Sequence, residues 1–195
     1  MGYLSLKTAA TTDPVTLTEA RAQLREVAAA EDNLIAALIT AATQDAEKVM
    51  QRPIMPQTWR FVADDFASES DGRICIPIPA RSITTFTYVR DTDGATATLA
   101  ASTDYLADFR GEYFTLVSPA YGISWPTPRV QPGAVEITLE AGWANAASVP
   151  AVVKQWILMR CAALFAHREA WTSGEAIFNN PFIDRMLDRW CINGV

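Results

Sequence analysis

The side chains able to perform nucleophilic or acid–base chemistry are few and widely scattered in this sequence. There is one histidine, His167, and neither a Gly-x-Ser-x-Gly motif nor a second histidine accompanies it. The sequence therefore lacks residues that Ser/His catalysis and a two-histidine metal site require. A histidine at the end of a predicted helix is explained by its interaction with the negative end of the helix dipole. The sequence indicates no histidine-based catalytic centre.

Two pairs of carboxylates are candidates for a general acid and a general base. Asp64 and Asp65 are adjacent, and Glu136 and Glu140 lie four residues apart. Nothing in their surroundings predicts a shifted pKa, and charged side chains are seldom buried in proteins. We interpret both pairs as solvated, and we predict no catalytic residue.

No pattern predicts a cofactor or a metal ion. The segment 91–94 is similar to the start of a calcium loop, but its glycine comes too early and Ser102 occupies the position of the bidentate glutamate, so we predict a turn. Cys75, Cys161 and Cys191 are odd in number and have no Cys-x-x-Cys spacing, which favours neither disulfides nor zinc. The glycines are too dispersed for a phosphate-binding loop.

Composition limits the class of partner. The chain has 195 residues, half of them hydrophobic, which suits a sizeable core. Its formal net charge is −6, whereas a protein that holds DNA by neutralising phosphates needs clustered lysine and arginine. Tight DNA binding is disfavoured.

We expect no targeting segment. The most apolar window, 149–166, contains Lys154, Gln155 and Arg160, which predicts a core helix and no membrane span.

Periodicity predicts helices at both ends of the chain. Thr16 and Glu19 form a capping-box pattern that begins a short helix ending near residue 26. A longer helix is predicted from Glu31 to about Arg52, where Pro53 ends it. Its apolar stripe is expected to comprise Leu34, Ile35, Leu38, Ile39, Ala42, Ala46 and Val49. Further helices are predicted over 149–166 and 181–190.

The middle of the chain has the period of β-strands. Strands are predicted at 74–78, 83–89, 113–117 and 135–140, with a hairpin turn at Asp93-Gly94 leading into a strand over 96–99. Prolines place the segment 74–78 at a sheet edge, and they predict a loop over 118–133. We therefore predict an α+β fold, with a helical core of about four helices and an antiparallel β region inserted between the second and third main helices.

The ordered landmarks of the sequence resemble those of the head–tail connector (adaptor) proteins of long-tailed bacteriophages and gene transfer agents. The resemblance covers about Leu17 to Ala170. Its landmarks, in chain order, are Leu17-Thr18-Glu19-Ala20, Leu24, Asp32, Leu34 to Ile39, Arg52-Pro53, Gln57-Thr58-Trp59, Ile76-Pro77, Pro79, Tyr88, Trp125-Pro126, Ala141-Gly142-Trp143, Val149-Pro150, Lys154-Gln155 and Arg168-Glu169-Ala170.

This resemblance implies a structural subunit without enzymatic activity or cofactor. Such subunits form a ring, usually twelve-fold, beneath the portal protein at one capsid vertex, and they present the other end to a stopper or tail component. Double-stranded DNA passes through the channel without specific binding. The expected location is the head–tail interface of a virion or phage-like particle assembled in the bacterial cytoplasm, with no membrane partner.

The predicted helices and strands divide the chain into segments, and the resemblance, which has no landmark in residues 171–195, suggests a role for them. Within one structural domain, they are an N-terminal arm (1–15), a helical pair (16–56), a β insertion (57–145), a core helix (146–170) and a C-terminal docking segment (171–195). The predicted portal-facing residues are Phe178, Phe182, Ile183, Met186 and Trp190; the alternative is that this apolar helix packs on its own domain. The residues predicted to lie at a subunit interface or in the core are Val152, Trp156, Met159 and Leu164.

Two other functions remain open from the residues alone. A monomeric β-rich module would hold a carbohydrate or peptide with Trp125 and the proline-rich loop. An enzyme with dispersed carboxylates would depend on Asp64 or Asp65.

Overall fold

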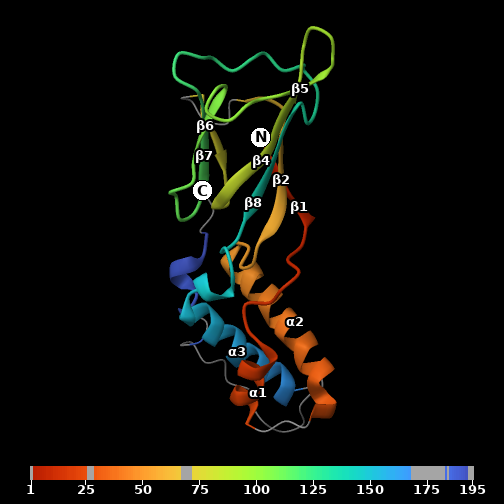
Figure 1. Ribbon diagram of the computed structural model, residues 1–195, viewed down its shortest axis with the longest axis vertical. Helices are drawn as coiled ribbons and strands as arrows, with labels where there is room; N and C mark the ends of the chain where they lie inside the picture. The colour runs from red at the N-terminus through yellow and green to blue at the C-terminus, as the bar shows by residue number, and fades with distance from the viewer. Residues whose placement is uncertain (1, 26–28, 67–71, 168–182, 184, 193–195) are drawn as a thin grey trace. The chain divides into compact units, whose positions relative to one another are not determined.

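The described residues of the computed structural model form two compact units (Figure 1). The structure describes residues 2–25, 29–66, 72–167, 183 and 185–192. Of these, 2–10 and 56–142 make up a β unit, and 11–55 and 143–192 make up a helical unit. Three α-helices and eight β-strands are found in the described part of the chain.

The larger sheet of the β unit is antiparallel and has five strands. Its central strand carries Ile137, which is paired with Phe61 on one side and Phe86 on the other, so three apolar side chains form a row across the sheet. All three are buried. In spatial order, the strands are β1 (Tyr3–Thr8), β2 (Gln57–Ala63), β8 (Val135–Ala141), β4 (Ala80–Val89) and β5 (Thr96–Thr98).

A second antiparallel sheet has the order β3 (Ile74–Ile76), β7 (Thr115–Pro119) and β6 (Tyr105–Asp108). Aromatic rings fill the core of the unit. Phe86 of β4 meets Tyr105 of β6 edge to face, with 5.0 Å between the ring centroids. Phe66 packs against Phe86 at 5.9 Å and against Tyr88 at 5.4 Å.

The helical unit packs α1 (Leu17–Leu24), α2 (Asp32–Met50) and α3 (Ala151–Ala166) against one another. Short 3₁₀ turns lie at Ala29–Glu31, Ala146–Ser148 and Asp188–Trp190. The buried stripe of α2 consists of Ile35, Ile39, Ala42, Thr43, Ala46 and Met50. Leu34 and Val49, which the sequence placed on this stripe, lie beside it and are exposed.

The two chain segments that meet at the end of α2 are joined by hydrogen bonds. Gln51 ends the helix in the left-handed conformation, with φ at 54°. The carboxylate of Glu47 accepts a bond of 2.8 Å from the Ile54 amide. The Ile54 carbonyl in turn accepts one of 2.8 Å from the Trp143 amide. Residues 89 positions apart in sequence are therefore tied together inside the helical unit.

The predicted capping box at the start of α1 is confirmed. Thr16 Oγ1 accepts a hydrogen bond of 3.2 Å from the Glu19 amide, and Glu19 Oε2 accepts one of 2.7 Å from the Thr16 amide. The backbone and hydroxyl bonds from Thr16 lower the pKa of Glu19. Because this pKa is depressed in the folded chain, the stabilisation is present above the unfolded pKa and is lost as the pH falls through the folded one.

Replacing Thr16 by alanine is expected to lower the free energy of unfolding by about 1 kcal/mol, because α1 loses its N-cap oxygen. Urea denaturation of the purified chain measures this change. Thr18→Ala is the matched control, since Thr18 is exposed and lies within the helix. Equal effects of the two substitutions would contradict the capping role.

The predicted fold class is wrong. The described residues form two antiparallel sheets and only three α-helices, so the chain is mainly β-rich and has no four-helix core with an inserted β region. Two segments account for the difference. Residues 3–8, assigned to an arm, form β1 because each pairs with β2 or flanks a bulge. In the segment 181–190, Asp188–Trp190 is a 3₁₀ turn where a continuous helix was expected.

Several local predictions for the β region are confirmed. The Asp93-Gly94 turn joins β4 to β5, with Gly94 at a φ of 68° and Ala95 donating to Asp93 Oδ1. The strand β3 lies at a sheet edge, as its flanking prolines indicated. The segment 120–134, between β7 and β8, is the proline-rich loop. It is fixed near its end by the Arg129 amide, which donates to the Val89 carbonyl at 2.9 Å.

Candidate functional site

The carboxylates that might have formed a catalytic pair are engaged in structural contacts. Asp64 Oδ1 accepts from the Gly133 amide at 2.8 Å, and Asp65 Oδ1 accepts from the Phe66 amide at 2.6 Å. Both therefore hold backbone in place.

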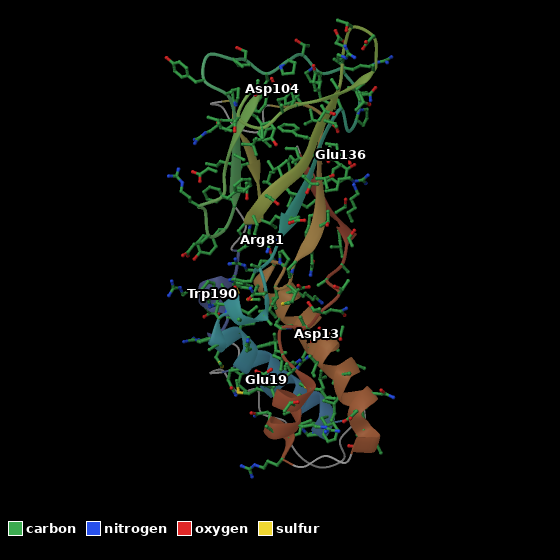
Figure 2. The ribbon with its side chains drawn as sticks, in the orientation of Figure 1. Asp13, Glu19, Arg81, Asp104, Glu136 and Trp190 are labelled. Carbon is green, nitrogen blue, oxygen red and sulfur yellow. The ribbon has the colours of Figure 1, made fainter. Side chains whose placement is uncertain are left out.

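Glu136 and Glu140 lie on the surface of β8. Glu140 pairs with Arg81 at 3.2 Å and Glu136 lies 3.9 Å from Arg60, with roughly half-exposed side chains in both pairs. Figure 2 labels Arg81 and Glu136, one residue of each pair. Exposed pairs of this kind contribute little to stability. They are solvated surface charges, as the sequence indicated.

The remaining candidates for chemistry are also isolated. His167 is exposed at the end of α3, where its amide donates to the Ala163 carbonyl. Burial raises the pKa of the Cys161 thiol, which disfavours the reactive thiolate. Within the described ranges, no three side chains of the metal-binding types gather in one place. None of the helices described is both long and apolar enough to cross a bilayer.

Trp125, which the sequence left as a possible ligand-stacking ring, is occupied within the β unit. Its ring stacks on Phe66 with 4.9 Å between centroids and an interplanar angle of 9°. Its Nε1–H donates to the Gly72 carbonyl at 2.6 Å. The ring thus fixes the proline-rich loop to the aromatic core, and one face of it is not open to a ligand.

The most distinctive cluster in the helical unit joins the end of α2 to the C-terminal segment. The Arg52 guanidinium lies 4.6 Å from the ring centroid of Trp143 and 5.8 Å from that of Trp190. The two indoles meet edge to face at 5.8 Å, and the Arg189 guanidinium lies 5.2 Å from the Trp190 ring. Cation–π contacts of this kind stabilise an arrangement by about 0.5–2 kcal/mol each. We call Arg52, Trp143, Arg189 and Trp190 the Trp–Arg cluster.

Backbone bonds and buried side chains reinforce the same attachment. The Ile192 amide donates to the Met50 carbonyl, which is at the end of α2, at 2.9 Å. Leu187 is fully buried and Ile192 is 5% exposed. The thiol of Cys191 lies 3.5 Å from the Val49 carbonyl oxygen and 3.3 Å from that of Leu187. Leu187 and Ile192 therefore belong to the core of the helical unit.

The structure describes three of the five predicted portal-facing residues. Ile183, Met186 and Trp190 are each partly exposed, and Trp190 also belongs to the Trp–Arg cluster. Phe178 and Phe182 lie outside the described residues. The portal-facing role of all five stays a prediction.

The four residues predicted for a subunit interface or the core all lie on α3, and they differ in burial. Val152 is 45% exposed, and Met159 and Leu164 are partly exposed. Trp156 is 6% exposed, yet its buried Nε1–H has no hydrogen-bond partner among the described residues. A buried donor without a partner costs about 1–3 kcal/mol. Helix α3 therefore combines an apolar surface with an unsatisfied donor.

Sequence reasoning missed the Trp–Arg cluster as a structural unit. Arg52-Pro53 and Ala141-Gly142-Trp143 stood out as landmarks, but nothing in them says that residues 91 positions apart in sequence share a cation–π contact. The available signal was composition, because two tryptophans and two arginines flank the predicted helix ends.

No protein-family model matches this sequence, and no curated protein matches it. The fold, in contrast, has solved counterparts. A chain from the virion of a native gene transfer agent (GTA) particle superposes with a TM-score of 0.76 at 20% identity, over 98% of this chain and 96% of that one.

Two further solved chains come from the neck of GTA particles. One, from an empty particle computed with C6 symmetry, has a TM-score of 0.74 at 21% identity, covering 99% of this chain and 97% of that chain. The other, from a native particle computed with C12 symmetry, has a TM-score of 0.67 at 18% identity, covering 98% and 97%. This chain therefore has a fold that also occurs in the neck of gene transfer agent particles.

Proposed function

We propose that this chain is a structural component of the neck of a virion or GTA-like particle. The proposal rests on the similarity in fold between this chain and chains from GTA necks. This similarity covers nearly the full length of each compared chain.

More specifically, we propose a head–tail connector (adaptor) that forms a ring beneath the portal protein, extends the DNA channel and meets a stopper or another tail-side connector. A ring of twelve copies is the form we expect. The acidic chain, with a formal net charge of −6, supports passage of double-stranded DNA without specific binding, since it does not neutralise phosphates. The particle would be assembled in the bacterial cytoplasm.

We propose that α3 contributes to the contact between neighbouring subunits. Val152, Met159 and Leu164 offer partly exposed apolar surface on one helix. A ring needs a heterologous interface, in which two different surfaces of each copy meet.

We propose that the docking segment 171–195 faces the portal, with Phe178, Phe182, Ile183, Met186 and Trp190 as anchors. Aromatic and large apolar side chains dominate the energetics of protein interfaces. The Trp–Arg cluster supports this role, because it attaches the end of the segment to the helical unit and would transmit load from a bound portal.

The decisive experiment is negative-stain imaging, with mass determination, of the purified chain alone and mixed with a GTA portal ring. Isolated rings, or portal rings that gain a collar, would support the connector role. A chain that stays monomeric and binds no portal ring would overturn it.

Replacing Met159 by glutamate is expected to reduce ring formation at least 10-fold, because the interface would bury a charge without a partner. The measurement is the fraction of ring particles at a fixed protein concentration. Gln44→Glu is the matched control, since Gln44 is exposed on α2. If both variants form rings as the unmodified chain does, the proposal that α3 contributes to the contact between subunits is wrong.

A further inference from the structure

The outer face of the three-stranded sheet carries an open hollow of about 610 Å³. Its apolar lining includes Leu106, Phe109 and Leu116, and Leu106 is 48% exposed although it lies on a strand. Arg73, Asp108 and Arg110 also line it. Exposed apolar surface next to polar side chains is typical of a protein contact site.

Arg110 is positioned to bind a second carboxylate. Its side chain is 90% exposed, and it donates to Asp108 from Nε at 2.8 Å and from Nη2 at 2.7 Å. A guanidinium has five N–H donors, so this pair leaves several of them available to an acidic group from outside. The hollow therefore suits an occupant with an apolar side chain next to an acid.

Another part of the β unit carries an exposed apolar side chain and an exposed acid on two linked segments. The turn after β4 and the end of the proline-rich loop are joined by a bridge between Arg90 and Pro128. We call residues 90–95 and 128–130 the tip. Val130 in the tip is 98% exposed. Asp91 is exposed and forms no ion pair with any described residue, whereas Asp93 lies 3.5 Å from Arg90.

Backbone hydrogen bonds and prolines restrain the tip. Gly94 donates to the Arg90 carbonyl at 3.0 Å, and Arg129 donates to the Val89 carbonyl at 2.9 Å. Pro128 and Pro132 restrict the loop further. A segment already held in its bound conformation loses little conformational entropy on binding, which favours association.

We propose that the tip of one copy of this chain occupies the hollow of the next copy, with Val130 against Leu106 and Phe109, and Asp91 beside Arg110. Within the β unit, β6 and β7 lie on one side and the β4–β5 hairpin on the other, which head-to-tail contact requires (Figure 1). The inference rests on the proposed function for its expectation that the contacts close into a ring.

A cysteine pair tests this contact directly. In a Cys75→Ala background, chains carrying Val130→Cys are mixed with chains carrying Leu106→Cys and oxidised. This background is needed because Cys75 on β3 is paired with Leu116, which lines the hollow, so its thiol could also be cross-linked. We expect a covalent dimer in the mixture at least 10-fold above that of either variant alone. The matched control replaces Leu106→Cys by Tyr3→Cys, an exposed position on β1.

Charge exchange provides an independent measurement in the same assay. Asp91→Arg and Arg110→Glu should each reduce the cross-linked yield several-fold, and combining the exchanges on the two facing chains should restore it. Equal cross-linking to Tyr3→Cys, or none to Leu106→Cys, would overturn the inference. If rings form without this cross-link, the inference fails and the proposed function stands. If the cross-linked chains form open polymers and no closed rings, the contact between tip and hollow is supported and the proposed ring is contradicted.

Discussion

Replacing Leu187 by alanine is expected to lower the free energy of unfolding of the helical unit by about 3 kcal/mol. Leu187 has no exposed surface, so its truncation removes buried apolar volume and leaves a cavity. The loss should also loosen residues 187–192, whose attachment includes the bond from the Ile192 amide to the Met50 carbonyl.

Two measurements separate these effects. Chemical denaturation gives the change in the free energy of unfolding, and hydrogen exchange at the Ile192 amide reports the local opening. The matched control is Leu34→Ala, because Leu34 is 38% exposed on α2 and should cost much less. A loss below about 1 kcal/mol for Leu187→Ala would show that the site collapses around the smaller side chain, contrary to our description.

Replacing Phe86 by alanine should destabilise the β unit by about 4 kcal/mol, the upper part of the range for buried aromatic residues. Its ring is fully buried and lies 5.0 Å from Tyr105 and 5.8 Å from Trp125. Its truncation therefore removes contacts to both sheets and to the proline-rich loop.

Near-ultraviolet circular dichroism during denaturation is the appropriate measurement, since this cluster holds several aromatic rings. Tyr121→Ala serves as the control, because Tyr121 is fully exposed on the same loop. Tyr121→Ala should change the free energy of unfolding by less than about 0.5 kcal/mol. Similar losses for the two variants would contradict the assignment of Phe86 to the core.

Local signals in the sequence predicted local structure well. The capping box at Thr16 and the turn at Gly94 each depend on residues within four positions, so their chemistry is visible in a short window. The strand β1 was missed for the opposite reason. Its partner β2 begins 49 residues after β1 ends, and most of its own side chains are exposed, so burial does not mark it.

The candidate site was less predictable than the fold. Trp190 was expected to face a partner, and an apolar pattern alone could not reveal that Arg52 and Trp143 contact its ring. Leu187 likewise belongs to the core although it lies within the segment 171–195, which was interpreted as a docking element. A hydrophobic side chain has the same sequence signal whether it is buried in its own chain or against another.

The hydrogen bond between Ile54 and Trp143 has a consequence for how this architecture can evolve and be engineered. The chain leaves the helical unit just after Ile54 and returns at Trp143, and the 2.8 Å bond between them holds these two crossing points side by side. Insertions between adjacent crossing points are tolerated because the host unit keeps its own contacts. Changes between these positions leave both crossing points in place if they keep the pairing of β2 with β1, which precedes the helical unit in the chain.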